Sequence, residues 1–127
     1  MGKVTEKVRF TNLLDPSLSV ELEAVVDTGA TMVVLPKNIV EELKLKRIRD
    51  AKVRYANNTI EQRTIYGVVT VEIQGRTGNF DVLAENEGSQ PLIGQVVLEV
   101  LDLVVDPKTR TLKPNPLSPD MPMVEVL

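Results

Sequence analysis

Asp27 is the strongest candidate for chemistry in this chain, because a charged side chain here directly follows an apolar run. Residues 18–26, LSVELEAVV, alternate like a half-buried strand, and the apolar stretch MVVLP begins at residue 32. A carboxylate at the edge of a core must be hydrogen-bonded, paired or exposed on a functional surface. Thr28 and Gly29 form a turn signal, so Asp27 either caps its own backbone in an ordinary turn or belongs to an active site.

The chain contains no histidine and no cysteine. These absences exclude disulfides, thiol catalysis, histidine-based triads and most zinc sites. If the protein is an enzyme, its acid–base chemistry falls to carboxylates, lysine, tyrosine or a bound cofactor. We expect no metal ion in the site and no cofactor.

The composition is that of one ordinary globular domain. The 127 residues are 43% hydrophobic and 26% charged, which is enough for a single core. The net charge of -3 and a pI near 5.0 argue against nucleic acid as the main partner. The densest basic stretch, KLKRIR at 44–49, is short, and we expect it to be a solvated helix end.

The sequence also predicts the location of the protein. The N-terminal segment MGKVTEKVRF lacks the apolar region of a secretory signal. No apolar run approaches the ~20 residues that are needed to span a bilayer. We therefore expect a cytoplasmic protein that does not act at a membrane.

Short strands dominate the predicted secondary structure, and the clearest covers residues 67–75, where Val69, Val71 and Ile73 recur at every second position. Asp15-Pro16-Ser17 separates the two strands of one predicted hairpin, and Asn57-Asn58 is a two-residue turn signal for a second hairpin. Pro36 marks the start of a helix whose apolar residues recur at helical spacing. The expected strands cover residues 7–14, 18–26, 32–36, 51–56, 59–65, 67–75, 80–85 and 110–114, with helices over 37–45 and in the middle of 91–106.

This pattern predicts a mainly β domain over residues 1–114, followed by a proline-rich tail over residues 115–127. Four of the eight prolines lie in the last 14 residues. We expect the tail to be an extended arm packed on another surface, or disordered.

Two motifs together resemble the retropepsin-like aspartic proteases of clan AA, the single-domain relatives of pepsin. Asp27-Thr28-Gly29-Ala30 matches the active-site loop, and Leu92-Ile93-Gly94 matches the segment that packs beside it. The resemblance runs from about Val4 to Pro114 and is closest to small prokaryotic members, which carry a helix after the active-site loop. It implies a retropepsin-like closed β-barrel, the acid-protease fold, with one or two short helices and a flap hairpin.

The resemblance implies an aspartic endopeptidase in which Asp27 is catalytic. Two aspartates that share one proton can hydrolyse a peptide bond, because one accepts a proton from water while the other donates to the carbonyl. The chain offers one such loop, so the family's solution is a homodimer in which the Asp27 residues of two subunits meet at the two-fold axis. The expected partners are a second copy and a peptide or protein substrate.

The same resemblance assigns roles to the loop residues. Gly29 lets the backbone approach the carboxylate in a conformation closed to bulkier residues. Thr28 points its hydroxyl across the subunit interface. Ala30 is small where substrate must pass, although a methyl group that simply fills the core is an equal explanation.

The flap is expected within residues 51–66, with Ala56, Asn57, Asn58 and Thr59 at its tip. Viral flaps are glycine-rich, whereas here asparagine substitutes at the left-handed positions.

A second departure from the viral pattern concerns an ion pair. Viral relatives pair an acid shortly after the first motif with an arginine after the second glycine. Those places hold Thr31 or Met32 and Gln95 here, so that pair is absent.

Two other function classes remain open at this point. A catalytically silent dimer of the same fold could bind extended peptides by strand addition. A small-molecule-binding β-barrel is a third class, but it would leave Asp27 unexplained. The intact Asp27-Thr28-Gly29 motif favours the enzyme.

Overall fold

The computed structural model describes residues 3–126. In this part of the chain, nine strands and two short helices follow one another in the order β1 (Val4–Asn12), β2 (Ser19–Val26), β3 (Val33–Pro36), α1 (Lys37–Glu42), β4 (Lys46–Arg54), β5 (Ile60–Ile73), β6 (Arg76–Glu85), β7 (Leu92–Ile93), α2 (Gln95–Leu101), β8 (Leu103–Asp106) and β9 (Thr111–Pro114). No helix among the described residues has the length and apolar character to cross a membrane.

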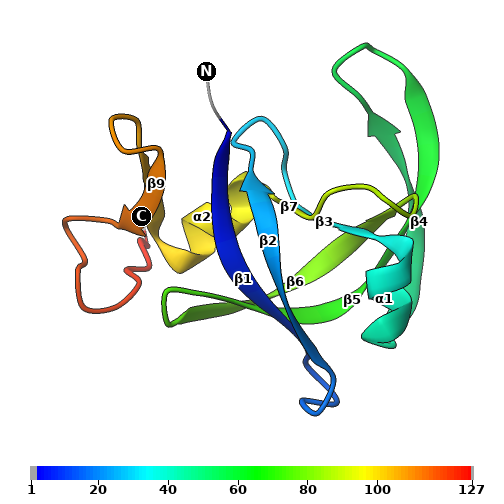
Figure 1. Ribbon diagram of the computed structural model, residues 1–127, viewed down its shortest axis with the longest axis horizontal. Coiled ribbons are helices and arrows are strands. Elements are labelled where there is room, and N and C mark those ends of the chain that lie inside the picture. Colours follow the sequence, from blue (N-terminus) through cyan, green and yellow to red (C-terminus); the bar gives the residue numbers. More distant parts are fainter. Residues whose placement is uncertain (1–2, 127) are drawn as a thin grey trace.

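Six strands close into a barrel (Figure 1). The sheet order is β1-β2-β7-β3-β6-β5, and antiparallel pairing of β1 with β5 joins the two ends of this series. β4 is a seventh strand that pairs only with β5, while β8 and β9 form a separate two-stranded sheet. The predicted mainly β, retropepsin-like closed barrel is confirmed.

The core fills the inside of this barrel, and its residues follow the period-two pattern of the strands. Val69, Val71 and Ile73 of β5 are completely buried, as are Val8 and Phe10 of β1. Each such side chain stabilises the fold by about 1.5–3 kcal/mol relative to an exposed one. The alternation seen in the sequence therefore identifies the inward face of these strands correctly.

The basic segment 44–49 is not a helix end, as the sequence suggested. α1 stops at Glu42, Lys44 adopts a left-handed conformation with φ of 52°, and β4 begins at Lys46. Residues 46–50 are exposed, because β4 is an edge strand that leaves the barrel. A segment with both faces in water has no apolar alternation, so periodicity identified only the second half of β4, within the strand expected over 51–56.

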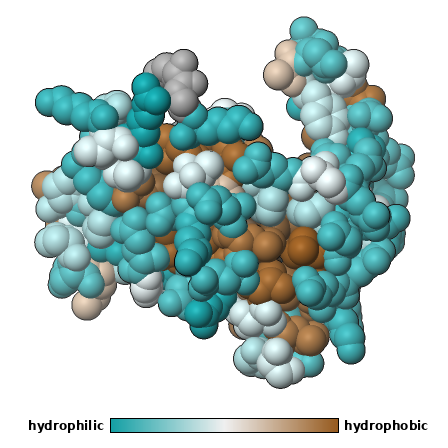
Figure 2. Space-filling model, viewed as in Figure 1, coloured by the Kyte–Doolittle hydropathy of each residue, from teal (hydrophilic) through white to brown (hydrophobic). Residues whose placement is uncertain are grey.

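β4 and the first part of β5 form a hairpin that projects from the barrel (Figures 1 and 2). Its turn has three residues rather than the two suggested by Asn57-Asn58. Tyr55 N donates to Thr59 O at 2.9 Å, Asn58 N donates to Tyr55 O at 2.9 Å, and Asn58 has a left-handed φ of 65°. A three-residue loop that ends in a left-handed residue is a common hairpin connection.

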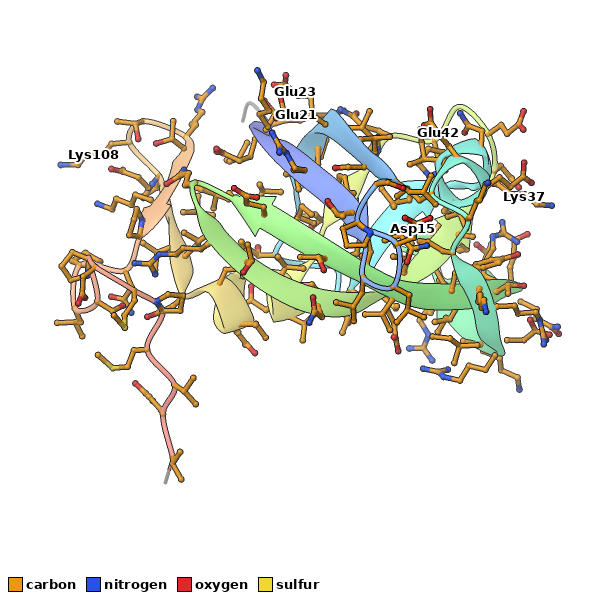
Figure 3. All side chains as sticks on the ribbon, turned by 90° about the horizontal axis from the view of Figure 1, so that it is seen from below. Asp15, Glu21, Glu23, Lys37, Glu42 and Lys108 are labelled. Carbon is orange, nitrogen blue, oxygen red and sulfur yellow. The ribbon has the colours of Figure 1, made fainter. Side chains whose placement is uncertain are left out.

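The segment after β9 is fastened to the end of α2 through Asp102. The Asp102 carboxylate accepts hydrogen bonds from Asn115 Nδ2 at 3.0 Å, from Met123 N at 3.0 Å and from Ser118 Oγ. Buried Arg76 donates from Nη1 to Asp102 O at 3.0 Å and from Nη2 to Ser118 O. Beyond this attachment the chain extends away from the body (Figure 3).

This attachment predicts a pH-dependent contact in the tail. Hydrogen bonds from Ser118, Asn115 and Met123 lower the pKa of Asp102 from 3.8 to about 2. Because the folded-state pKa is depressed, the stabilisation is present above 3.8 and is lost as the pH falls toward 2. The Met123 amide resonance should therefore titrate with a midpoint of about 2 by NMR.

Two variants check this prediction. Asp102→Asn should abolish the transition, whereas Asp120→Asn, an exposed carboxylate of the same segment, should leave it unchanged. A midpoint at the ordinary aspartate value of 3.8 would contradict the hydrogen bonds to the Asp102 carboxylate.

Candidate active site

Asp27 lies at the point where β2 ends and the chain turns toward β3. Its backbone N–H donates to Ile93 O at 3.0 Å, so the residue is still attached to the barrel through β7. Ala30 N donates to Asp27 O at 3.1 Å and closes the turn. The Asp27 side chain is exposed in the single chain. A carboxylate thus stands at the edge of the core on a rigid support, free to meet another molecule.

Gly29 orients this carboxylate through its backbone. Gly29 N donates to Asp27 Oδ1 at 2.9 Å, and a Cβ atom on Gly29 would lie 3.2 Å from the same oxygen. Gly29 does not have a positive φ, so the expectation of a conformation closed to other residues is wrong. Glycine serves here because it lets the chain come close to the carboxylate.

β7 brings the second motif beside the loop. This two-residue strand lies between β2 and β3, with Val26 and Ile93 as parallel neighbours and Val34 paired with Leu92 in the antiparallel direction. Val25 N also donates to Pro91 O at 2.9 Å. The structure therefore places Leu92 and Ile93 against the strands that enter and leave the Asp27 turn.

Gly94 is the point of closest backbone contact in the site. It is buried, and a Cβ atom there would lie 2.5 Å from the carbonyl carbon of Thr31 and 2.6 Å from Met32 N and O. Backbone atoms cannot move aside as the end of a flexible side chain can. No residue larger than glycine fits without displacing the loop.

The loop in turn caps α2. Gln95 N donates to Ala30 O at 2.8 Å, and Val96 N donates to Thr31 O at 2.9 Å. These N–H groups belong to the first turn of the helix. N–H groups at this position have no acceptor within the helix itself. Gly94, the N-cap residue, supplies no side-chain cap. The loop that carries Asp27 and the start of α2 therefore satisfy each other's backbone groups.

The other predicted loop residues occupy neighbouring positions. Thr28 is exposed beside Asp27. Ala30 is half-buried, and its carbonyl oxygen accepts from the first N–H group of α2. The Gln95 side chain points along its own helix, with Nε2 3.4 Å from Glu99 Oε1. The loop and the start of α2 are thus connected by backbone groups rather than by the Gln95 side chain.

The predicted flap residues lie apart from the loop, at the tip of the β4–β5 hairpin. Ala56, Asn57, Asn58 and Thr59 are all exposed. Their hydrogen bonds are internal to the tip: Asn57 Oδ1 accepts from Thr59 N at 3.1 Å and from Thr59 Oγ1 at 2.6 Å. The single chain therefore presents a tip that is ordered by its own hydrogen bonds.

A cleft of about 530 Å³ adjoins the loop on the side of α2. Met32, Val68, Val96 and Val100 contribute to its lining, whereas Asp27 does not. This cleft therefore does not contain the candidate carboxylate, which lies on an open surface. Within residues 3–126, no group of three or more acidic, histidine or cysteine side chains could hold a metal ion.

One cluster that joins the hairpin to the end of β6 was not anticipated from the sequence. Tyr55 OH and Arg63 Nε both donate to the carboxylate of Glu85, which is the last residue of β6. The partners are 30 and 22 residues apart in the chain, and no local pattern connects them. Only the arrangement of the strands brings them together.

The family model described as gag-polyprotein putative aspartyl protease matches residues 19–100, which include both motifs. The chain belongs to this family. It is a retropepsin-like aspartic protease by family and by fold. A search among curated proteins found no match.

Two solved viral proteases share the fold of this retropepsin-like chain. The protease of simian foamy virus (mac), solved in solution, is 20% identical, with a TM-score of 0.52 over 74% of this chain and 90% of that one. The EIAV protease in complex with the inhibitor HBY-793 is 21% identical, with a TM-score of 0.56 over 76% of this chain and 86% of that one. The specific resemblance to small prokaryotic members stays a prediction.

The contact at Gly94 leads to a test of how the loop is supported. Gly94→Ala should lower the free energy of unfolding by about 1–3 kcal/mol, because the added methyl group overpacks the backbone of Thr31 and Met32. Urea denaturation measures this loss. Gln95→Ala, one residue further on, changes a half-buried side chain without a backbone clash and is the matched control. Equal free energies of unfolding for the two variants would show that the loop can move to accommodate a methyl group at position 94.

Proposed function

We propose that this protein is an aspartic endopeptidase that works as a homodimer, with Asp27 of each subunit forming the catalytic dyad. The observation that carries the proposal is the position of Asp27. Its carboxylate is exposed and oriented by Gly29 N–H at 2.9 Å, on a loop held by β7 and α2, in a chain of the aspartyl protease family. Such rigid support is what a catalytic group requires.

In the proposed mechanism the two carboxylates share one proton. Two negative charges roughly 3 Å apart cannot both persist, so the pair stays singly protonated over a useful pH range. The ionised Asp27 accepts a proton from a water molecule, whose oxygen attacks the scissile carbonyl carbon. The protonated Asp27 donates its proton to the carbonyl oxygen, and collapse of the tetrahedral intermediate then sends a proton to the leaving amine.

The hairpin tip is the proposed flap. Residues 56–59 would cover an extended peptide in the cleft between the subunits, excluding water and pairing with the substrate backbone. Thr28 is proposed to face its counterpart across the two-fold axis, and Ala30 to border the substrate. A peptide or protein substrate and a cytoplasmic location complete the proposal.

The second candidate is a catalytically silent dimer that binds extended peptides in the same cleft. β4 is an edge strand that pairs only with β5, which favours peptide binding by strand addition for both the protease and the silent module. The two candidates differ in turnover alone. A wild-type protein that binds members of a diverse peptide library but cleaves none, with affinity equal to that of Asp27→Asn, would identify the silent module.

Mixed dimers test the two-subunit mechanism. Asp27→Asn is nearly isosteric and removes charge repulsion at the axis, so the variant should fold and pair while losing at least about 10²-fold in activity. If subunits exchange and pair at random, activity should fall as the square of the wild-type fraction, and an equal mixture should retain about a quarter.

The control mixture uses Asp15→Asn, which alters an exposed carboxylate in the turn between β1 and β2 (Figure 3). Activity in that mixture should not change. A linear decline with Asp27→Asn, after exchange has been confirmed by mass-tagged subunits, would mean that each chain works alone.

The pH dependence of the rate provides a further test. A carboxylate dyad without histidine predicts a bell-shaped profile of kcat/KM with an acidic to mildly acidic optimum. The two apparent pKa values would belong to the pair rather than to either Asp27. A single sigmoid that keeps rising into the alkaline range would contradict the dyad and indicate lysine or tyrosine chemistry.

A further inference from the structure

The β4–β5 hairpin is joined to the barrel along a short stretch only. β4 pairs with β5 alone, and the pairing of β5 with β6 ends at Ile65, opposite Leu83. Beyond this point the hairpin is a two-stranded ribbon (Figure 1). An isolated two-stranded ribbon is only marginally stable in water. Its direction relative to the barrel therefore depends on side chains that connect it to the neighbouring strands.

Glu85 connects both strands of the ribbon to β6. Arg63, which belongs to β5, donates from Nε to Glu85 Oε1 at 3.0 Å. Tyr55 directly follows β4 and donates its hydroxyl hydrogen to Glu85 Oε2. Each oxygen of the Glu85 carboxylate thus accepts a hydrogen bond from one side of the ribbon. Hydrogen bonds to an ionised acceptor are about twice as strong as those between neutral groups.

This cluster differs from an ordinary surface ion pair in its burial. The side chains of Arg63 and Glu85 are 20% and 14% exposed, whereas those of the Lys7–Glu21 pair on the barrel are 73% and 46% exposed. Water and salt screen a sheltered pair less. The Arg63 guanidinium also lies 5.8 Å above the Tyr55 ring, within the range of a cation–π interaction.

We propose that Glu85 is a positioning residue that fastens both strands of the hairpin to β6, through Tyr55 and Arg63, and so sets the direction of the flap over the substrate. Its kinetic consequence rests on the proposed function, whereas the contact itself does not. If the contacts of Glu85 with Tyr55 and Arg63 are lost, the hairpin adopts more directions. A smaller fraction of molecules is then competent to bind a peptide substrate. The apparent dissociation constant rises by the inverse of that fraction.

The kinetic test separates positioning from a simple loss of stability. Glu85→Gln should raise KM for a peptide substrate roughly tenfold, and Tyr55→Phe about threefold, because each removes a hydrogen bond to a charged group. kcat should stay within about twofold, since a closed complex keeps its geometry once formed. Activities are normalised to the concentration of folded protein. If Glu85 had a merely structural role, KM and kcat would then both be unchanged, and that result would overturn the proposal.

Asp50→Asn is the matched control. The Asp50 carboxylate accepts from Thr64 Oγ1 and Gln62 Nε2, both at 3.0 Å, and lies 3.0 Å from Arg47 Nη2. All of these partners belong to the hairpin, so this variant weakens the ribbon internally without freeing it from β6. KM should not change. A rise in KM equal to that of Glu85→Gln would mean that any weakening of the hairpin has the same effect, against a special role for Glu85.

Two further measurements need no enzymatic activity. The chain has two tyrosines and no tryptophan, so in a Tyr66→Phe background Tyr55 is the single phenol in the ultraviolet titration. Burial, followed by the hydrogen bond to Glu85, raises the pKa of Tyr55 above 10.0, and Glu85→Gln should bring that pKa down. An unchanged titration would overturn the contact, whether or not the protein is a protease.

The direction of the hairpin can be followed with a spin label. The chain has no cysteine, so a nitroxide on Asn57→Cys is unique and lies at the tip. In the Asp27→Asn background, paramagnetic broadening of amides in residues 28–31 reports how the tip is distributed. Glu85→Gln should change the broadening pattern and Asp50→Asn should preserve it. Identical patterns in all three proteins would contradict a positioning role even if proteolysis is confirmed.

Discussion

The site depends on the backbone contact between the Asp27 loop and the start of α2. Ala30 O and Thr31 O accept the first N–H groups of the helix, while Gly94 lets the two segments approach to a distance that leaves no room for a Cβ atom. Each side supplies what the other lacks, because a helix start has free donors and a turn has free acceptors. The position of Asp27 is therefore set by obligatory backbone hydrogen bonds, which any folded form of the barrel must satisfy.

The closed barrel makes this contact possible. β7 has two residues, too few for a stable strand by itself, yet it lies between β2 and β3 and carries the chain directly into Gly94. The hairpin contrasts with this arrangement, since half of it lies outside the barrel. One chain thus combines a rigid base for a carboxylate with a hairpin that projects from the barrel, the proposed flap. Enzymes that enclose extended substrates need both properties.

The departure from the viral ion pair has a structural counterpart in this chain. The viral pattern joins the loop and the helix through an acid and an arginine, whereas here Thr31, Met32 and Gln95 occupy those places. The same two segments are joined by hydrogen bonds from Gln95 N to Ala30 O and from Val96 N to Thr31 O, and the Gln95 side chain lies along its own helix. A backbone connection of this kind does not titrate.

The sequence by itself determined the features that depend on local pattern and composition. The alternation of Val69, Val71 and Ile73 identified a buried strand face. Asp27-Thr28-Gly29 identified the candidate carboxylate, and together with Leu92-Ile93-Gly94 it identified the family. Tertiary structure decided the rest. The strand over 46–54 was predicted only from residue 51 onward, because residues 46–50 are exposed and only their pairing with β5 defines them. Glu85 meets Tyr55 and Arg63 because strand register brings distant residues together, and no spacing along the chain encodes that meeting.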